Sequence, residues 1–99
     1  MAVIKTLEVS AQNTFSAKFT LVGDYALSRH EQRRALICAT RDDSAVTLRR
    51  YGADGTTVIA SLDLGSVMES VEVPVTGLYD IGVATGNYGA AAVTITVEQ

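Results

Sequence analysis

Residues 14–21 decide the fold class of this chain, and they read Thr-Phe-Ser-Ala-Lys-Phe-Thr-Leu. Polar and apolar side chains alternate along the whole stretch, which places them on opposite faces of an extended chain. A period of two is typical of a strand with one buried face and one exposed face. The side chains expected to face the core are Phe15, Ala17, Phe19 and Leu21.

Seven other stretches extend this pattern over the rest of the chain. Residues 71–75 (Val-Glu-Val-Pro-Val) and 93–97 (Val-Thr-Ile-Thr-Val) alternate in the same way. The remaining candidate strands are Val3–Val9, Ala35–Thr40, Ala45–Tyr51, Thr57–Leu62 and Leu78–Ala84. About eight short strands at roughly ten-residue spacing predict a sandwich or a barrel. We therefore expect an all-β protein, a single antiparallel β-sandwich of jelly-roll-like form, that spans residues 1–99.

Three local features refine this prediction. Asp54-Gly55 is a strong hairpin signal because both turn positions favour a positive φ. Pro74 interrupts a strand pattern and therefore indicates an edge strand or a bulge. Residues 25–34 fit either a polar loop or a short helix, with a capping box formed by Ser28 and Glu31.

The charges of the chain are unevenly distributed. The first fifty residues hold all eight bases and five acids, a charge of +3, whereas residues 51–99 hold six acids and no base, a charge of −6. Such an asymmetry between halves points to a partner of complementary charge. We expect the arginines, which are the main basic concentration, to face an acidic protein surface. A solvated face without a partner is an equally open alternative.

Few residues offer catalysis or metal binding. His30 is the only histidine and stands in a charged segment, so an enzyme that depends on it is the least favoured alternative. One His and one Cys fall short of the roughly three or four ligands of a zinc site. The pair Asp42-Asp43 falls short of the roughly six oxygens that calcium takes. We expect no enzyme, no cofactor and no metal.

The single cysteine, the hydropathy and the residues around the arginines bear on disulfide formation and on the kinds of partner. Cys38 is the only cysteine, so no internal disulfide can form. It lies in an apolar run and is expected to be a small core hydrophobe. No segment approaches the roughly 20 apolar residues that span a bilayer, and the N-terminus lacks the pattern of a signal peptide. Acids are interleaved with the arginines, and no aromatic platform accompanies them. We therefore expect neither a membrane nor a nucleic acid as a partner.

The second half of the chain carries a recognisable order of motifs. Residues 46–50 read Val-Thr-Leu-Arg-Arg, residues 51–57 read Tyr-Gly-Ala-Asp-Gly-Thr-Thr, and residues 77–88 read Gly-Leu-Tyr-Asp-Ile-Gly-Val-Ala-Thr-Gly-Asn-Tyr. This order resembles that of small β-sandwich virion proteins of tailed bacteriophages, and the match covers roughly the last half of the chain. It departs at Thr57 and Val58, where that family usually has a Trp, and at Asp80, where Arg is common.

The resemblance implies a component of the phage particle. We expect a capsid decoration (cement) protein, made in the host cytoplasm and located on the capsid surface, that binds and bridges major capsid protein subunits. The small size favours a dimer or a trimer. The alternative is a tail or head-fibre module that binds a host surface carbohydrate. The residues expected to contact partners are Arg29, Arg33, Arg34, Arg49, Arg50, Tyr79 and Tyr88.

Overall fold

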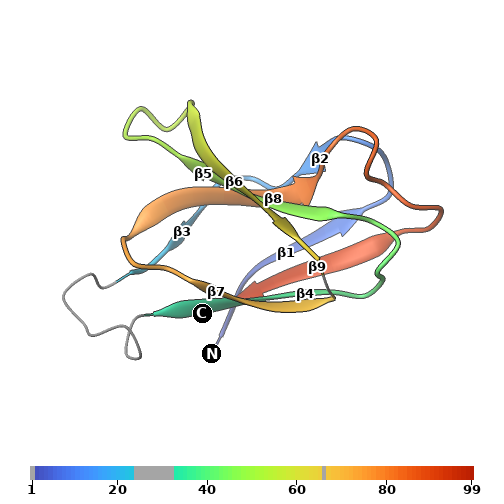
Figure 1. Cartoon of the computed structure of the whole chain (residues 1–99), viewed down its shortest axis with the longest axis horizontal. Helices are drawn as coiled ribbons and strands as arrows, with labels where there is room; N and C mark the ends of the chain where they lie inside the picture. The colour runs from blue at the N-terminus through green and yellow to red at the C-terminus, as the bar shows by residue number, and fades with distance from the viewer. Residues whose placement is uncertain (1, 24–32, 66) are drawn as a thin grey trace.

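Two antiparallel sheets lie one over the other (Figure 1). The computed structural model describes residues 2–23, 33–65 and 67–99, and these residues contain nine strands. Sheet A has the order β1-β9-β4-β7, and sheet B has the order β2-β8-β5-β6, with β3 also paired to β8. The strands are β1 (Val3–Val9), β2 (Thr14–Phe15), β3 (Phe19–Leu21), β4 (Arg34–Ala39), β5 (Val46–Tyr51), β6 (Val58–Leu64), β7 (Met68–Glu72), β8 (Gly77–Val83) and β9 (Val93–Glu98).

The strands pair in a nested order around the β5–β6 hairpin. β5 pairs with β6, β4 with β7, β2 and β3 with β8, and β1 with β9. Successive pairs of this long double ribbon lie in alternate sheets, which is the wrapping of a jelly roll. The predicted antiparallel β-sandwich is therefore confirmed, and its strand order is that of a jelly roll.

Period-two alternation builds the core between the sheets. Along β9, Val93, Ile95 and Val97 are fully buried, whereas Thr94 and Thr96 remain partly exposed. Each such apolar side chain contributes about 1.5–3 kcal/mol when it leaves water. The other core residues from the two inner faces are Val9, Phe19, Leu21, Ala35, Ile37, Val46, Leu48, Leu64, Val73, Tyr79, Ile81 and Val83.

Residues 14–21 form two strands and not the one strand that their alternation predicts. Phe15 pairs with Gly82 and Phe19 pairs with Tyr79, so four steps along this segment lie opposite three steps along β8. The segment therefore carries one extra residue, as in a β-bulge. This split explains why nine strands stand where about eight were expected.

Ser16 closes the interruption between β2 and β3. Its backbone N–H donates to the Ile81 carbonyl at 2.8 Å, and its Oγ accepts a hydrogen bond from the Ile81 N–H at 3.2 Å. The bulge shifts the alternation, so that Ala17 is exposed. The prediction that Ala17 faces the core is therefore wrong. It is also wrong for Phe15, whose ring lies against the Arg49 guanidinium and outside the core. Phe19 and Leu21 are buried as expected.

The β5–β6 connection is longer than the predicted two-residue turn. Gly55 has a φ of 72°, but Asp54 is not among the residues with a positive φ, so the expectation for Asp54 is wrong. The Asp54 carboxylate instead accepts hydrogen bonds from the N–H groups of Thr56 and Thr57, each at 3.0 Å. These bonds hold a wider loop in which only the glycine needs the left-handed region.

Two further expectations concern strand positions. The strand predicted over residues 71–75 lies earlier, at β7, and Pro74 follows its end because proline has no N–H to extend the ladder. β7 is nevertheless an edge strand, as Pro74 indicated. Cys38 is half-buried on the outer face of sheet A, so its predicted place in the core is wrong, because the buried positions of β4 are Ala35 and Ile37.

Gly82 lies where β2 approaches β8 too closely for a side chain. A Cβ at position 82 would lie 2.6 Å from Phe15 Cα and closer still to the Thr14 carbonyl oxygen. We expect Gly82→Ala to lower the free energy of unfolding by about 2 kcal/mol, which is the usual cost of overpacking. Urea unfolding measures this change. The control is Gly65→Ala, because nothing lies within 4 Å of a Cβ there; equal midpoints for the two variants would contradict the close approach.

Candidate partner-binding site

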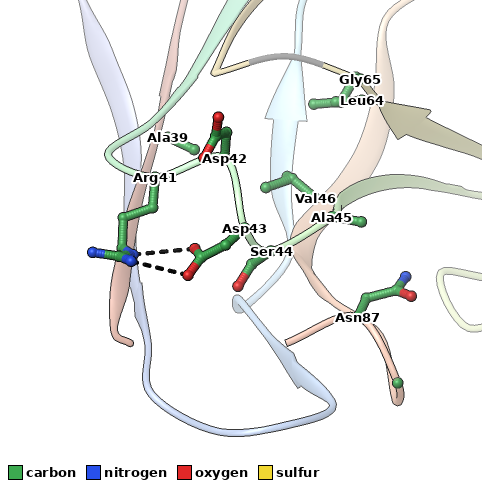
Figure 2. A pocket seen from close by; sticks show the side chains of 11 residues that line it. Ala39, Arg41, Asp42, Asp43, Ser44, Ala45, Val46, Leu64, Gly65 and Asn87 are labelled. Carbon is green, nitrogen blue, oxygen red and sulfur yellow. Dashed lines mark hydrogen bonds and ion pairs between the residues drawn. The ribbon is translucent and has the colours of Figure 1, made fainter. Parts of the chain in front are cut away.

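The paired aspartates border a cavity of about 400 Å³ at one end of the sandwich (Figure 2). Arg41 lies against Asp43, with its Nε 3.1 Å from Oδ1 and its Nη2 3.0 Å from Oδ2. The hydrogen bond from Arg41 holds the pKa of the Asp43 carboxyl below its usual range. Among the described residues, no three His, Cys, Asp or Glu side chains are grouped so that they could hold a metal ion. The Asp43 carboxylate therefore has a cationic partner within the chain.

A second polar group lies on the outer face of sheet B. Asp80 on β8 is only 3% exposed and accepts three hydrogen bonds. Arg49 donates from Nε at 2.8 Å and from Nη2 at 2.7 Å, and the Tyr51 hydroxyl donates at 2.5 Å. The Arg49 guanidinium also lies 3.5 Å from the centroid of the Phe15 ring. We call Asp80, Arg49, Tyr51 and Phe15 the Asp80 cluster.

The Asp80 cluster is satisfied within the protein. Burial, followed by the hydrogen bond to Asp80, raises the pKa of the Tyr51 phenol. The hydrogen bond that Arg49 donates to Asp80 likewise raises the pKa of Arg49. A bidentate arginine–carboxylate pair of this kind is among the stronger polar interactions in proteins. Arg49 is therefore engaged in joining β5 to β8, while 28% of its side chain remains exposed.

The open side of the sandwich lies between β6 and β7, the neighbouring edges of the two sheets. Six of the seven residues of β6 are exposed. Leu62 pairs with the buried Leu48 and so shares its inward face, yet it is 45% exposed. Further large apolar side chains are exposed around this edge: Val58, Ile59, Val67 and Met68. An edge with several exposed large apolar side chains is a candidate site of interaction.

Beneath Leu62 is a cavity of about 290 Å³, which we call the edge groove. Leu48 and Tyr79 from sheet B and Val71 from β7 line it together with Leu62. Tyr79 is 8% exposed and belongs to the core, so its ring forms a wall of the groove and does not project from the surface. The groove is therefore an opening into the core itself.

Arg50 brings a cation into this apolar groove. It pairs in register with Ala60 and Tyr79, so it points to the inner side of sheet B, opposite to Arg49. Its Nε is buried and has no hydrogen-bond partner. The ion pairs found among residues 2–23, 33–65 and 67–99 do not include Arg50. Arg50 thus lines the groove and also a neighbouring cavity, where its Nε and Nη2 lie beside Gly77. Its charge has no carboxylate partner in the described part of the chain.

The other residues predicted to contact partners lie apart from the groove. Arg29 lies outside the described residues, as does His30. Arg33 and Arg34 are exposed beside and at the start of β4, and Arg34 donates to Ser70 Oγ at 2.7 Å. Tyr88 is half-buried in the connection between β8 and β9. The predicted residues that the structure describes therefore lie on different faces and connections of the sandwich. The basic and acidic halves of the sequence interleave, because β8 and β9 lie inside sheets that also contain β2, β5, β1 and β4.

Sequence reasoning missed the apolar edge at β6. The segment 58–64 reads Val-Ile-Ala-Ser-Leu-Asp-Leu and carries apolar residues at both odd and even positions near its start. An edge strand that keeps apolar side chains on both faces is the available signal, since edges are usually protected by charge. Whether a strand lies at an edge, however, depends on the strand order of the sheet, which the sequence of the segment alone does not give.

Comparison of the chain with protein-family models, with curated proteins and with solved structures finds no match. Within the described residues, no helix is long and apolar enough to cross a membrane. The geometry of the chain itself must therefore carry any assignment.

The Asp80 cluster generates a stability prediction. We expect Asp80→Asn to lower the free energy of unfolding by about 3 kcal/mol, because it removes the charge that pairs with the partly buried Arg49. Urea unfolding of Asp80→Asn and of the matched control Asp42→Asn, which changes an exposed carboxylate, measures this loss. If both variants unfold at the wild-type midpoint, the cluster does not hold β5 to β8.

Proposed function

We propose that this protein is a non-enzymatic structural component of a phage virion, a capsid decoration protein that binds major capsid protein subunits and stabilises the head. The observation that carries the protein-binding part is the open edge between β6 and β7. It presents exposed apolar side chains and a partnerless cation, which are features of a docking surface. The resemblance of residues 46–57 and 77–88 to virion proteins of tailed phages supports the location.

The proposed mechanism depends on the rigid edge of each copy and on the many copies bound to one shell. A jelly roll with a continuous core holds its edge in one conformation, so binding costs little ordering of the protein. Each bound copy adds its own binding free energy, and many copies on one shell add up to mechanical stabilisation. No catalytic group is required for this role, and the protein acts on the surface of the assembled particle.

The carbohydrate alternative requires exposed aromatic rings. Tyr51 and Tyr79 are each 8% exposed, and Tyr88 lies in a different connection, so the described tyrosines do not present a common platform. Aromatic rings that bind sugars offer their faces to the ligand, whereas the rings of Tyr51 and Tyr79 are buried. The described residues therefore favour the decoration protein.

Gradient sedimentation of lysate from the native source tests the proposal, with the protein followed by mass spectrometry. We expect co-migration with intact heads at a stoichiometric copy number, because a decoration protein occupies repeated lattice sites. Migration with tails at low copy number would favour the fibre module. Recovery in the light fraction alone would remove the virion assignment.

The exposed base at position 33 gives a test of charge pairing with the capsid. We expect Arg33→Glu to weaken binding to heads, since a rim charge steers association toward an acidic surface. The measurement is the salt-dependent affinity for heads that lack the protein, with Lys5→Glu on β1 as the matched charge reversal. Equal affinities for wild type and Arg33→Glu would show that Arg33 does not face the capsid.

A further inference from the structure

Strand β6 differs from the other edge strands of the sandwich. β1 carries Lys5 and an irregular register next to it, and the opposite edge of sheet B is split into β2 and β3. β7 is five residues long and includes Glu69 and Glu72. β6 runs for seven residues with Asp63 as its one charge, and its pairing with β5 has a register shift only at its start, opposite Tyr51. Charges, breaks and short length are the usual protections against strand addition, and β6 has the fewest of them.

The groove beside β6 shows what kind of side chain an added strand would supply. Its walls are apolar at Leu48, Leu62 and Val71, so an incoming segment needs apolar side chains at inward positions. Arg50 lines the same groove without a carboxylate partner. A carboxylate brought into the groove would meet the guanidinium in surroundings of low polarity, where a charge-assisted hydrogen bond is strong.

A second copy of this chain fits the groove poorly. In a symmetric pairing of two β6 strands, the inward positions offered by each copy are the apolar Ala60, Leu62 and Leu64. These residues would cover both guanidinium groups of Arg50 without giving either a carboxylate, and burying an unpaired charge is costly. The occupant must therefore differ from β6 at an inward position.

We infer that β6 accepts an extended segment of another particle protein as an additional strand of sheet B, and that an Asp or Glu side chain of this segment pairs with Arg50 in the edge groove. Main-chain hydrogen bonds along the free edge of β6 supply affinity, and the alternate side chains that enter the groove supply selectivity. The inference rests on the proposed function for the identity of the partner as a capsid protein.

Arg50→Met tests the role of the charge. Methionine retains an apolar stem that fills the groove, and it removes the cation. We expect the affinity for heads that lack the protein to fall at least tenfold, while the urea midpoint stays the same or rises, because an unpaired buried cation is replaced by an apolar group. The control is Lys18→Met, which removes an exposed cation near Tyr51 on the outer face of the same sheet.

The outcomes separate the two proposals. If wild-type protein does not bind heads, the proposed function fails and the inference falls with it. If wild type and Arg50→Met bind heads equally, the inference is overturned while the proposed function stands. A loss of binding accompanied by a lower urea midpoint also counts against the inference, since Arg50 would then act by stabilising the fold.

Photo-cross-linking identifies the occupant of β6. A benzoylphenylalanine at Ser61, an exposed position of β6, is compared with one at Thr20, an exposed position at the opposite edge of sheet B. We expect illumination of decorated heads to join Ser61 to a capsid-protein peptide that contains Asp or Glu. Cross-linking of Ser61 to a second copy of this chain, or no cross-link from Ser61, would overturn the assignment of the partner strand.

Discussion

The hydrogen-bonded carboxylate of Asp80 is the interaction on which sheet B depends. A carboxylate that is 3% exposed requires donors, and β5 supplies both of them from its outward positions, Arg49 and Tyr51. The guanidinium of Arg49 also packs on the Phe15 ring, which holds β2 against β8. Gly82 allows this close approach because it has no side chain to separate the strands. One buried charge thus joins three strands.

This arrangement assigns different tasks to two adjacent arginines. Arg49 and Arg50 follow each other in β5, so their side chains leave opposite faces of the sheet. Arg49 meets an acid of the same chain, whereas Arg50 enters the groove and meets none among the described residues. Part of the charge asymmetry between the halves of the sequence is therefore neutralised within the fold, where Arg49 pairs with Asp80. The charge of Arg50 at the β6 edge is not used in this way within the described residues.

Much of the fold could be predicted from local pattern. The range Val3–Val9 is the same in the sequence and in β1, and the alternation of residues 93–97 is realised in the burial of β9. The failures arise where a residue depends on its neighbours across the sheet. Ala17 alternates correctly in sequence, but the extra residue opposite β8 moves it to the surface. The candidate site was harder still, because neither the exposure of Leu62 nor the isolation of Arg50 can be derived without the strand order. Tyr79, for example, was expected at an interface and lies in the core.

The nested pairing of the strands also bears on how the chain reaches this structure. The β5–β6 loop is short, so its closure costs little conformational entropy, whereas β1 and β9 come from opposite ends of the sequence. We expect assembly to start at the central hairpin and to proceed outward through β4 with β7 and then β8, with the pairing of β1 and β9 as the last and slowest step. Until that step is complete, the edge of β9 that β1 covers has no paired strand, and an unpaired strand edge favours association with another chain.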